Sequence, residues 1–227
     1  QRFNTANGLT VSGNTEVDGG TIKLDGNYPT GTNNVALGDT ALDDGSLSGS
    51  HNTAIGHAAL TANTSGASNT GIGREALAIT TTGSNNTAVG KLALYANTTA
   101  SNNTAVGTDA LVSNTTGASN TAVGAECLDT NTTGEQHAAL GKNALKANTT
   151  GSNSVAIGAG ALRNNTTASN NTAVGTSALN ANTTANNNTA VGKDAMILNT
   201  TGAANTALGY TAFYNNTTAS GGVAIGN

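Results

Sequence analysis

The residues whose types could do chemistry are few and widely spaced. The chain has a single cysteine, Cys127, and three histidines, His51, His57 and His137. No cysteine or acidic residue accompanies them at the spacing that a zinc site requires. A lone cysteine in a position otherwise held by alanine predicts a small packed side chain, not a nucleophile or a disulfide partner. We therefore expect no catalytic, cofactor-binding or metal-binding residues, no cofactor and no enzymatic activity.

Two short motifs match patterns of ligand sites. The stretch GIGREA at residues 71–76 fits the G-x-G-x-x-A dinucleotide pattern, which requires a strand followed by a helix in a βαβ unit. Here the stretch spans the junction between two units of the repeat described below, so we interpret it as structural. Asp39, Asp43 and Asp44 carry the oxygen ligands that calcium prefers, but a solvated acidic loop is the interpretation that we favour. Asn-x-Thr sequons, as at Asn97, arise automatically from the repeat.

The composition excludes several classes of function. Only 9% of the residues are charged and 3% are aromatic, whereas about a quarter of an ordinary globular domain is charged. The net charge of -4 and the absence of a basic stripe argue against nucleic-acid binding. No apolar run reaches the roughly 18 residues of a membrane helix, so we expect no membrane insertion in this segment.

A repeat dominates the chain from residue 34 to residue 227. Its unit reads G-x-x-A-L-x-x-N-T-T-[GA]-x-x-N-T-A-V, and the repeat glycines are separated by 18 residues once and by 17 residues thereafter. These glycines are Gly38, Gly56, Gly73, Gly90, Gly107, Gly124, Gly141, Gly158, Gly175, Gly192, Gly209 and Gly226. Near-identical units predict an extended, uniform structure. They argue against an enzyme, because a catalytic site is a set of residues that occurs once in a chain.

The unit predicts one coil of a parallel β-solenoid. Apolar runs of two to four residues without a 3.6-residue period disfavour helices. Two short strands and two turns fit 17 residues, and coils would stack about 4.8 Å apart. We expect an all-β fold of about eleven such coils over residues 34–227, continuing beyond Asn227. Residues 1–33 are predicted to form a β-rich lead-in, in which Val11, Ile22 and Leu24 cap the first coil.

The substitution pattern leads to a prediction of which side chains face inward. Side chains alternate along a strand. The residue before each glycine is always Val, Ile or Leu, and the Leu position accepts only Met196 and Phe213, so we predict that both lie in the core. The alanines beside them would then face outward. Strict alanine next to variable positions such as Arg74 and Tyr210 predicts that another chain packs there; homogenisation by recent duplication is the alternative.

The predicted trimer-interface residues come from the alanine column of the Thr-Ala-Val segment. They are Ala54, Ala88, Ala105, Ala122, Ala139, Ala156, Ala173 and Ala190. Two columns of asparagine, represented by Asn97 and Asn103, are expected to form amide ladders between coils.

The repeat resembles two families of surface fibre. NSVAIGAGAL (residues 153–162) is similar to the Asn-Ser-Val-Ala-Ile-Gly repeats of trimeric autotransporter adhesin heads, which implies a left-handed β-roll in a homotrimer, intertwined or side by side. Those heads usually have 14-residue coils, so the 17-residue period is a departure. ALYANTTASNNTAVG (residues 93–107) and the opening segment at residues 7–38 look more like tail-fibre proteins of marine and cyanobacterial phages.

The resemblance implies a structural or adhesive fibre segment that spaces or presents host-receptor-binding parts of a virion. The expected partners are two further copies of the chain, other virion or fibre proteins, and a host-surface glycan or protein. The expected location is the outward-facing part of the virion. A bacterial adhesin head on the cell surface is the alternative. Ice binding is a further alternative, although Thr98 and Thr99 are adjacent and are expected to point to opposite faces.

Overall fold

The structure, a computed structural model, describes residues 32–227. The described chain forms a parallel β-solenoid with one 12-stranded sheet, in which each strand pairs with the strands of the preceding and following coils. The strands are β1 (Val35–Leu37), β2 (Thr53–Ile55), β3 (Thr70–Ile72), β4 (Thr87–Val89), β5 (Thr104–Val106), β6 (Thr121–Val123), β7 (Ala138–Leu140), β8 (Val155–Ile157), β9 (Thr172–Val174), β10 (Thr189–Val191), β11 (Thr206–Leu208) and β12 (Val223–Ile225).

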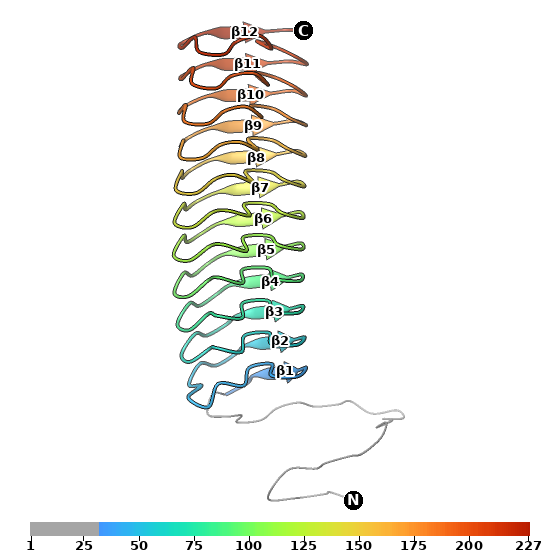
Figure 1. Cartoon of the computed structure of the whole chain (residues 1–227), viewed down its shortest axis with the longest axis vertical. Helices are drawn as coiled ribbons and strands as arrows, with labels where there is room; N and C mark the ends of the chain where they lie inside the picture. The colour runs from blue at the N-terminus through green and yellow to red at the C-terminus, as the bar shows by residue number, and fades with distance from the viewer. Residues whose placement is uncertain (1–31) are drawn as a thin grey trace, which may run out of the picture.

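The coils stack as a straight column, with β1 at one end and β12 at the other (Figure 1). The register is in line throughout, so that Thr87 pairs with Thr104 and Ala88 with Ala105. This arrangement confirms the predicted all-β solenoid of about eleven turns with 17 residues in each coil. The predicted lead-in, with its capping residues Val11, Ile22 and Leu24, lies outside the described residues except for Thr32 and Asn33.

The repeat glycine is required by the turn that follows each strand. At Gly107 the backbone has φ +136°, a conformation that residues with a Cβ rarely adopt. A Cβ atom there would also lie 2.6 Å from the carbonyl oxygen of Gly124 in the next coil. Positive φ and close stacking of the backbone therefore both explain why glycine recurs at this position.

Left-handed residues replace the expected second strand. Counting the repeat glycine as the first position, the third and fifth positions have φ near +55°, as at Asp109 (φ 58°) and Leu111 (φ 53°). Because this segment is not extended, its side chains do not alternate. Ala110 and Leu111 are adjacent, yet both are fully buried. The prediction that the leucine column lies in the core is confirmed, but the inference that the alanine before it faces outward is wrong.

The strand alanines also lie inside the solenoid. Every predicted interface alanine is buried: Ala54, Ala88, Ala105, Ala122, Ala156, Ala173 and Ala190 are 0% exposed and Ala139 is 1% exposed. Thr and Val share the opposite, outer side of the strand, and Val106 is only partly buried. The alternation was predicted correctly, but the side that faces the core was not. The alanines therefore face the chain's own leucines and offer no surface to another chain.

Two columns of asparagine complete the interior. In the first, Asn131 Nδ2 donates hydrogen bonds to Asn114 Oδ1 in the preceding coil (2.8 Å) and to the Gly134 carbonyl (2.9 Å). This amide ladder runs from Asn97 to Asn216 and confirms the predicted stacking. In the second column, asparagines mainly bond to backbone: Asn103 Oδ1 accepts the backbone N–H of Asn120 (2.9 Å). Buried amides therefore satisfy backbone polar groups of the interior and one another.

Candidate functional site: the outer faces of the solenoid

The residues first considered for chemistry lie apart from one another. Cys127 fills an alanine position in the core, and burial raises the pKa of its thiol to about 12. At neutral pH the thiol is therefore protonated and is a poor nucleophile. His51 contacts Asn33, with its Nε2 3.2 Å from Asn33 Nδ2. His57 is exposed, with its Nε2 4.0 Å from Asp39 Oδ2. These side chains do not lie together at one site.

His137 replaces an asparagine in the second ladder and reproduces its hydrogen bonds. Its Nε2 donates to the Gly151 carbonyl at 2.7 Å, and its Nδ1 accepts the backbone N–H of Ser154 at 3.3 Å. This pattern requires the neutral Nε2–H tautomer. Burial lowers the pKa of His137, which favours the same neutral form. The residue is a structural member of the ladder.

The acidic loop of the first coil has local hydrogen bonds. Asp44 Oδ1 accepts the backbone N–H of Ser46 at 2.8 Å and also the Ser46 hydroxyl. These bonds lower the pKa of the Asp44 carboxyl. Within residues 32–227, no three His, Cys, Asp or Glu side chains are arranged to hold a metal ion. The same residues include no helix that is long and apolar enough to cross a membrane.

The outer surface has three chemically distinct strips. The first is the apolar stripe, formed by the residue before each repeat glycine on the outer side of the sheet. It consists of Leu37, Ile55, Ile72, Val89, Val106, Val123, Leu140, Ile157, Val174, Val191, Leu208 and Ile225. A column made mostly of threonine runs beside it, and no charged residue occurs in any described strand. Several stripe residues are well exposed, including Leu140 at 49% and Leu208 at 48%.

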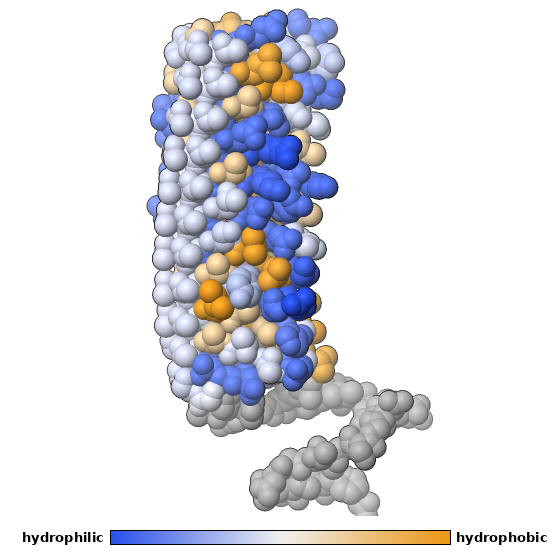
Figure 2. Space-filling view, in the orientation of Figure 1, coloured by the Kyte–Doolittle hydropathy of each residue, from blue (hydrophilic) through white to orange (hydrophobic). Residues whose placement is uncertain are grey.

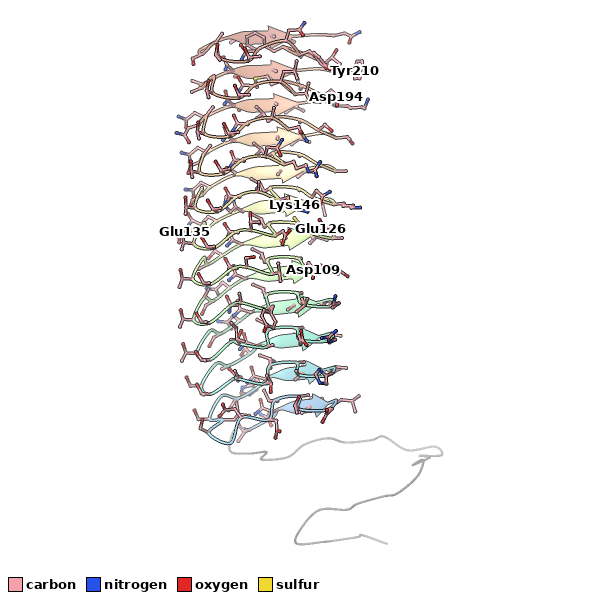
Figure 3. All side chains as sticks on the ribbon, viewed as in Figure 1. Asp109, Glu126, Glu135, Lys146, Asp194 and Tyr210 are labelled. Atoms are coloured by element: carbon pink, nitrogen blue, oxygen red, sulfur yellow. The ribbon has the colours of Figure 1, made fainter. Side chains whose placement is uncertain are left out.

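The second strip is the variable face, formed by the second, third, sixth and seventh positions of each coil. It carries every lysine and arginine of residues 32–227 and every acidic residue there except Glu135. Figure 3 shows Asp109, Glu126, Lys146, Asp194 and Tyr210 along one side of the stack and Glu135 on the other.

Charges on the variable face are partly paired between coils. Lys146 forms an ion pair with Glu126 and lies 3.7 Å from Asp129 Oδ2. The hydrogen bond from Lys146 lowers the pKa of Glu126, whereas desolvation raises the pKa of Asp129. Lys193 lies 5.4 Å from the ring centroid of Tyr210. These are local surface interactions that do not converge on one binding site.

The third strip is the threonine edge, formed by the ninth and tenth positions. Its ninth-position residues are Thr64, Thr81, Thr98, Thr115, Thr132, Thr149, Thr166, Thr183, Thr200 and Thr217. Its tenth-position residues are Ser65, Thr82, Thr99, Thr116, Thr133, Thr150, Thr167, Thr184, Thr201 and Thr218. In Figure 2 one side of the column is mostly pale, whereas the side that carries the labelled charges of Figure 3 mixes blue and orange.

The apolar stripe was not predicted as a surface, because its residues were expected in the core. The inner volume could have revealed it, because a leucine, methionine or phenylalanine in each coil leaves room for alanine, not for valine, on the facing strand. Comparison with known proteins adds no closer assignment, since no family model, curated protein or solved structure matches the chain. The fold and its surfaces define the chain as a parallel β-solenoid repeat protein with 17-residue coils.

Proposed function

We propose that the chain is a structural segment of a virion fibre, in which three copies form a stiff left-handed β-roll trimer. The segment spaces or presents the parts that bind a host-surface glycan or protein, and it joins other fibre proteins at its ends. The straight stack of coils supports a spacer role, because each coil bonds to its neighbours along the whole length (Figure 1). The uniform interior of residues 32–227 supports it as well, since it repeats the same columns of alanine, leucine and asparagine along the stack.

The observation that carries the proposal is the apolar stripe. An uncharged column of valine, isoleucine and leucine follows the outer side of all 12 strands. Apolar surface removed from water contributes about 25 cal/mol per Å², so a stripe of this length favours burial against a partner. Exposed apolar strips of large extent mark interaction surfaces in soluble proteins.

Copies of the same chain are the partner that fits the stripe. A strip that repeats at every coil matches another strip with the same spacing, and identical coils provide it. Three sheets facing a common axis would bury the stripe of each copy, and β-branched side chains pack well on such pleated surfaces. The interface therefore moves from the alanine column of the initial prediction to the stripe beside it.

A bacterial surface adhesin head is the second candidate, since it would use the same trimer. Sequence flanking the segment separates the two. A virion fibre has ends that bind other virion proteins, whereas an adhesin has a signal peptide, a stalk and a membrane anchor.

Light scattering tests the trimer and its interface together. The unmodified protein is expected to have three times the chain mass of 22.0 kDa. Replacing Val89, Val106 and Val123 together with lysine places three charges on the stripe and should give folded monomers, checked by circular dichroism.

The matched control adds the same charge to the variable face, by Thr108→Lys, Ala159→Lys and Thr176→Lys together. This variant should stay trimeric. A monomeric unmodified protein, or a stripe variant that remains trimeric, contradicts the proposal.

A further inference from the structure

The threonine edge is uniform although the solenoid does not require it to be. The tenth position is exposed in every coil from Ser65 to Thr218, and it holds threonine in all of them except at Ser65. The second position is also a surface position, yet it changes from Arg74 to Thr108 to Tyr210 within the same chain. Duplication of the repeat alone would have left both columns equally uniform.

No contact inside the described chain explains the tenth-position threonines. The ninth-position hydroxyls donate to the next coil, as Thr115 Oγ1 does to the Thr132 carbonyl at 3.0 Å. Within residues 32–227, the tenth-position hydroxyls have no hydrogen-bond partner in the protein, and they remain free for groups outside it. The neighbouring Asn114 is fully buried and both of its amide hydrogens are used, so glycosylation of that sequon in the folded protein does not explain Thr116 either.

The edge presents both columns to the surface. Thr98 is half-buried and Thr99 is exposed, and this stretch is a bend and not a strand, so the alternation of a strand does not assign the two side chains to opposite faces. Hydrogen bonds hold the ninth-position hydroxyls in place, and branching at Cβ limits the rotamers of both columns. The result is a rigid double row of methyl and hydroxyl groups that repeats about every 4.8 Å.

Because the threonine edge repeats the same groups at a constant spacing, it fits a ligand whose own groups repeat along a line. Small molecules and globular proteins without a repeat do not offer ten equivalent groups in a straight row, and the repeating strip that another copy of the chain would contact is assigned above to the apolar stripe. A charged polymer is disfavoured, because neither threonine column contains a charged residue. Neutral polysaccharide is disfavoured because these columns contain no aromatic residue on which a sugar ring could stack. An ordered lattice of water remains, since hydroxyls both donate to and accept from water and methyl groups order the water beside them.

We propose that the threonine edge binds the surface of ice. This activity is independent of the fibre proposal, because the edge and the apolar stripe occupy different positions of the coil. A trimer joined through the stripe leaves the three edges available.

Thermal hysteresis and inhibition of ice recrystallisation test the proposal on the unmodified protein. Hysteresis is expected in the unmodified chain and is expected to be lost when Thr116, Thr133 and Thr150 are replaced together with lysine. The control with lysine at Thr108, Ala159 and Thr176 should retain full hysteresis, and circular dichroism verifies that both variants are folded.

Four outcomes overturn the proposal. The first is an unmodified protein without hysteresis. The second is an edge variant that retains hysteresis. The third is a variant with lysine at Val89, Val106 and Val123 that loses hysteresis while the edge is intact. The fourth is sedimentation with insoluble cellulose or chitin that depends on Thr116, Thr133 and Thr150, which would assign the edge to polysaccharide. Light scattering measures the trimer separately from hysteresis, so failure of the ice-binding proposal is distinguishable from failure of the trimer.

Discussion

A Cβ atom on Gly71 would lie 3.4 Å from Leu60 Cγ, in contact with the leucine of the same coil, and 3.2 Å from the Ala76 carbonyl oxygen. The other fully enclosed coils hold alanine at this position, and those alanines are buried. The space between the strand and the facing leucine therefore accepts one methyl group and little more. This limit explains the strict alanine column without a second chain.

Replacing Ala105 with valine should destabilise the solenoid. The two added methyl groups have no space beside the leucine column, and overpacking of a core costs about 1–3 kcal/mol. The free energy of unfolding in urea measures the effect. Val106→Ile adds a methyl group to the outer side of the same strand and should leave the stability of the isolated coil stack nearly unchanged. Equal losses for both variants would show that the inner side of the strand has been assigned wrongly.

Replacing Thr80 with asparagine should stabilise the protein. Asn63 Oδ1 is buried and has no hydrogen-bond partner, because Thr80 Oγ1 in the next coil donates to the Asn97 carbonyl instead. An asparagine at residue 80 would donate to Asn63 Oδ1 and to the Gly83 carbonyl, as Asn114 and its equivalents do. Satisfying a buried acceptor is worth about 1–3 kcal/mol.

The melting temperature of Thr80→Asn measures this gain. The control is Thr82→Asn at the exposed tenth position, where no ladder exists and no gain is expected. A melting temperature at or below that of the unmodified protein would mean that the ladder does not extend to the first coils.

His137 should make stability depend on pH. Its pKa is lowered in the folded protein from an ordinary value of 6.5, so the unfolded chain binds a proton more readily. The stabilisation from neutral His137 is therefore complete above the unfolded pKa and decreases as pH falls through and below it. Protonation also removes the acceptor at Nδ1 for the backbone N–H of Ser154.

Unfolding midpoints between about pH 7.5 and pH 5 measure this dependence, in the range where histidine titrates and most carboxyls do not. His137→Asn restores the residue used elsewhere in the column and should remove most of the decline. His57→Asn, at an exposed site, should keep it. A decline of equal size in His137→Asn would assign it to other groups.

Much of the fold could be predicted from the repeat itself. The glycine spacing sets the length of the coil, because each glycine has a backbone conformation that other residues rarely adopt. The leucine column and the first amide ladder follow from residues such as Leu94 and Asn97, which recur in most coils and are buried.

The direction of the strand side chains could not be predicted in the same way. Alternation shows that Thr104 and Val106 share a face and that Ala105 has the other, but it does not show which face lies inside. That depends on the width of the coil, which the opposing Leu94 and the left-handed turns determine. Hydrophobicity alone favours valine for the interior, and the narrow interior accepts only alanine. The candidate site therefore moved by one residue, from Ala105 to Val106.

The most direct test of the proposed fibre trimer is a distance between chains at the apolar stripe. A spin label on Val106→Cys, in a Cys127→Ala background that removes the buried thiol, reports whether the outer sides of the sheets face one another. Sheets that pack face to face lie about 10 Å apart, so dipolar measurements should give inter-chain distances of roughly 10–20 Å. A label at Thr108→Cys on the variable face should give longer distances. The absence of any inter-chain coupling at residue 106, or a shorter distance at residue 108 than at residue 106, would contradict a trimer built on the stripe.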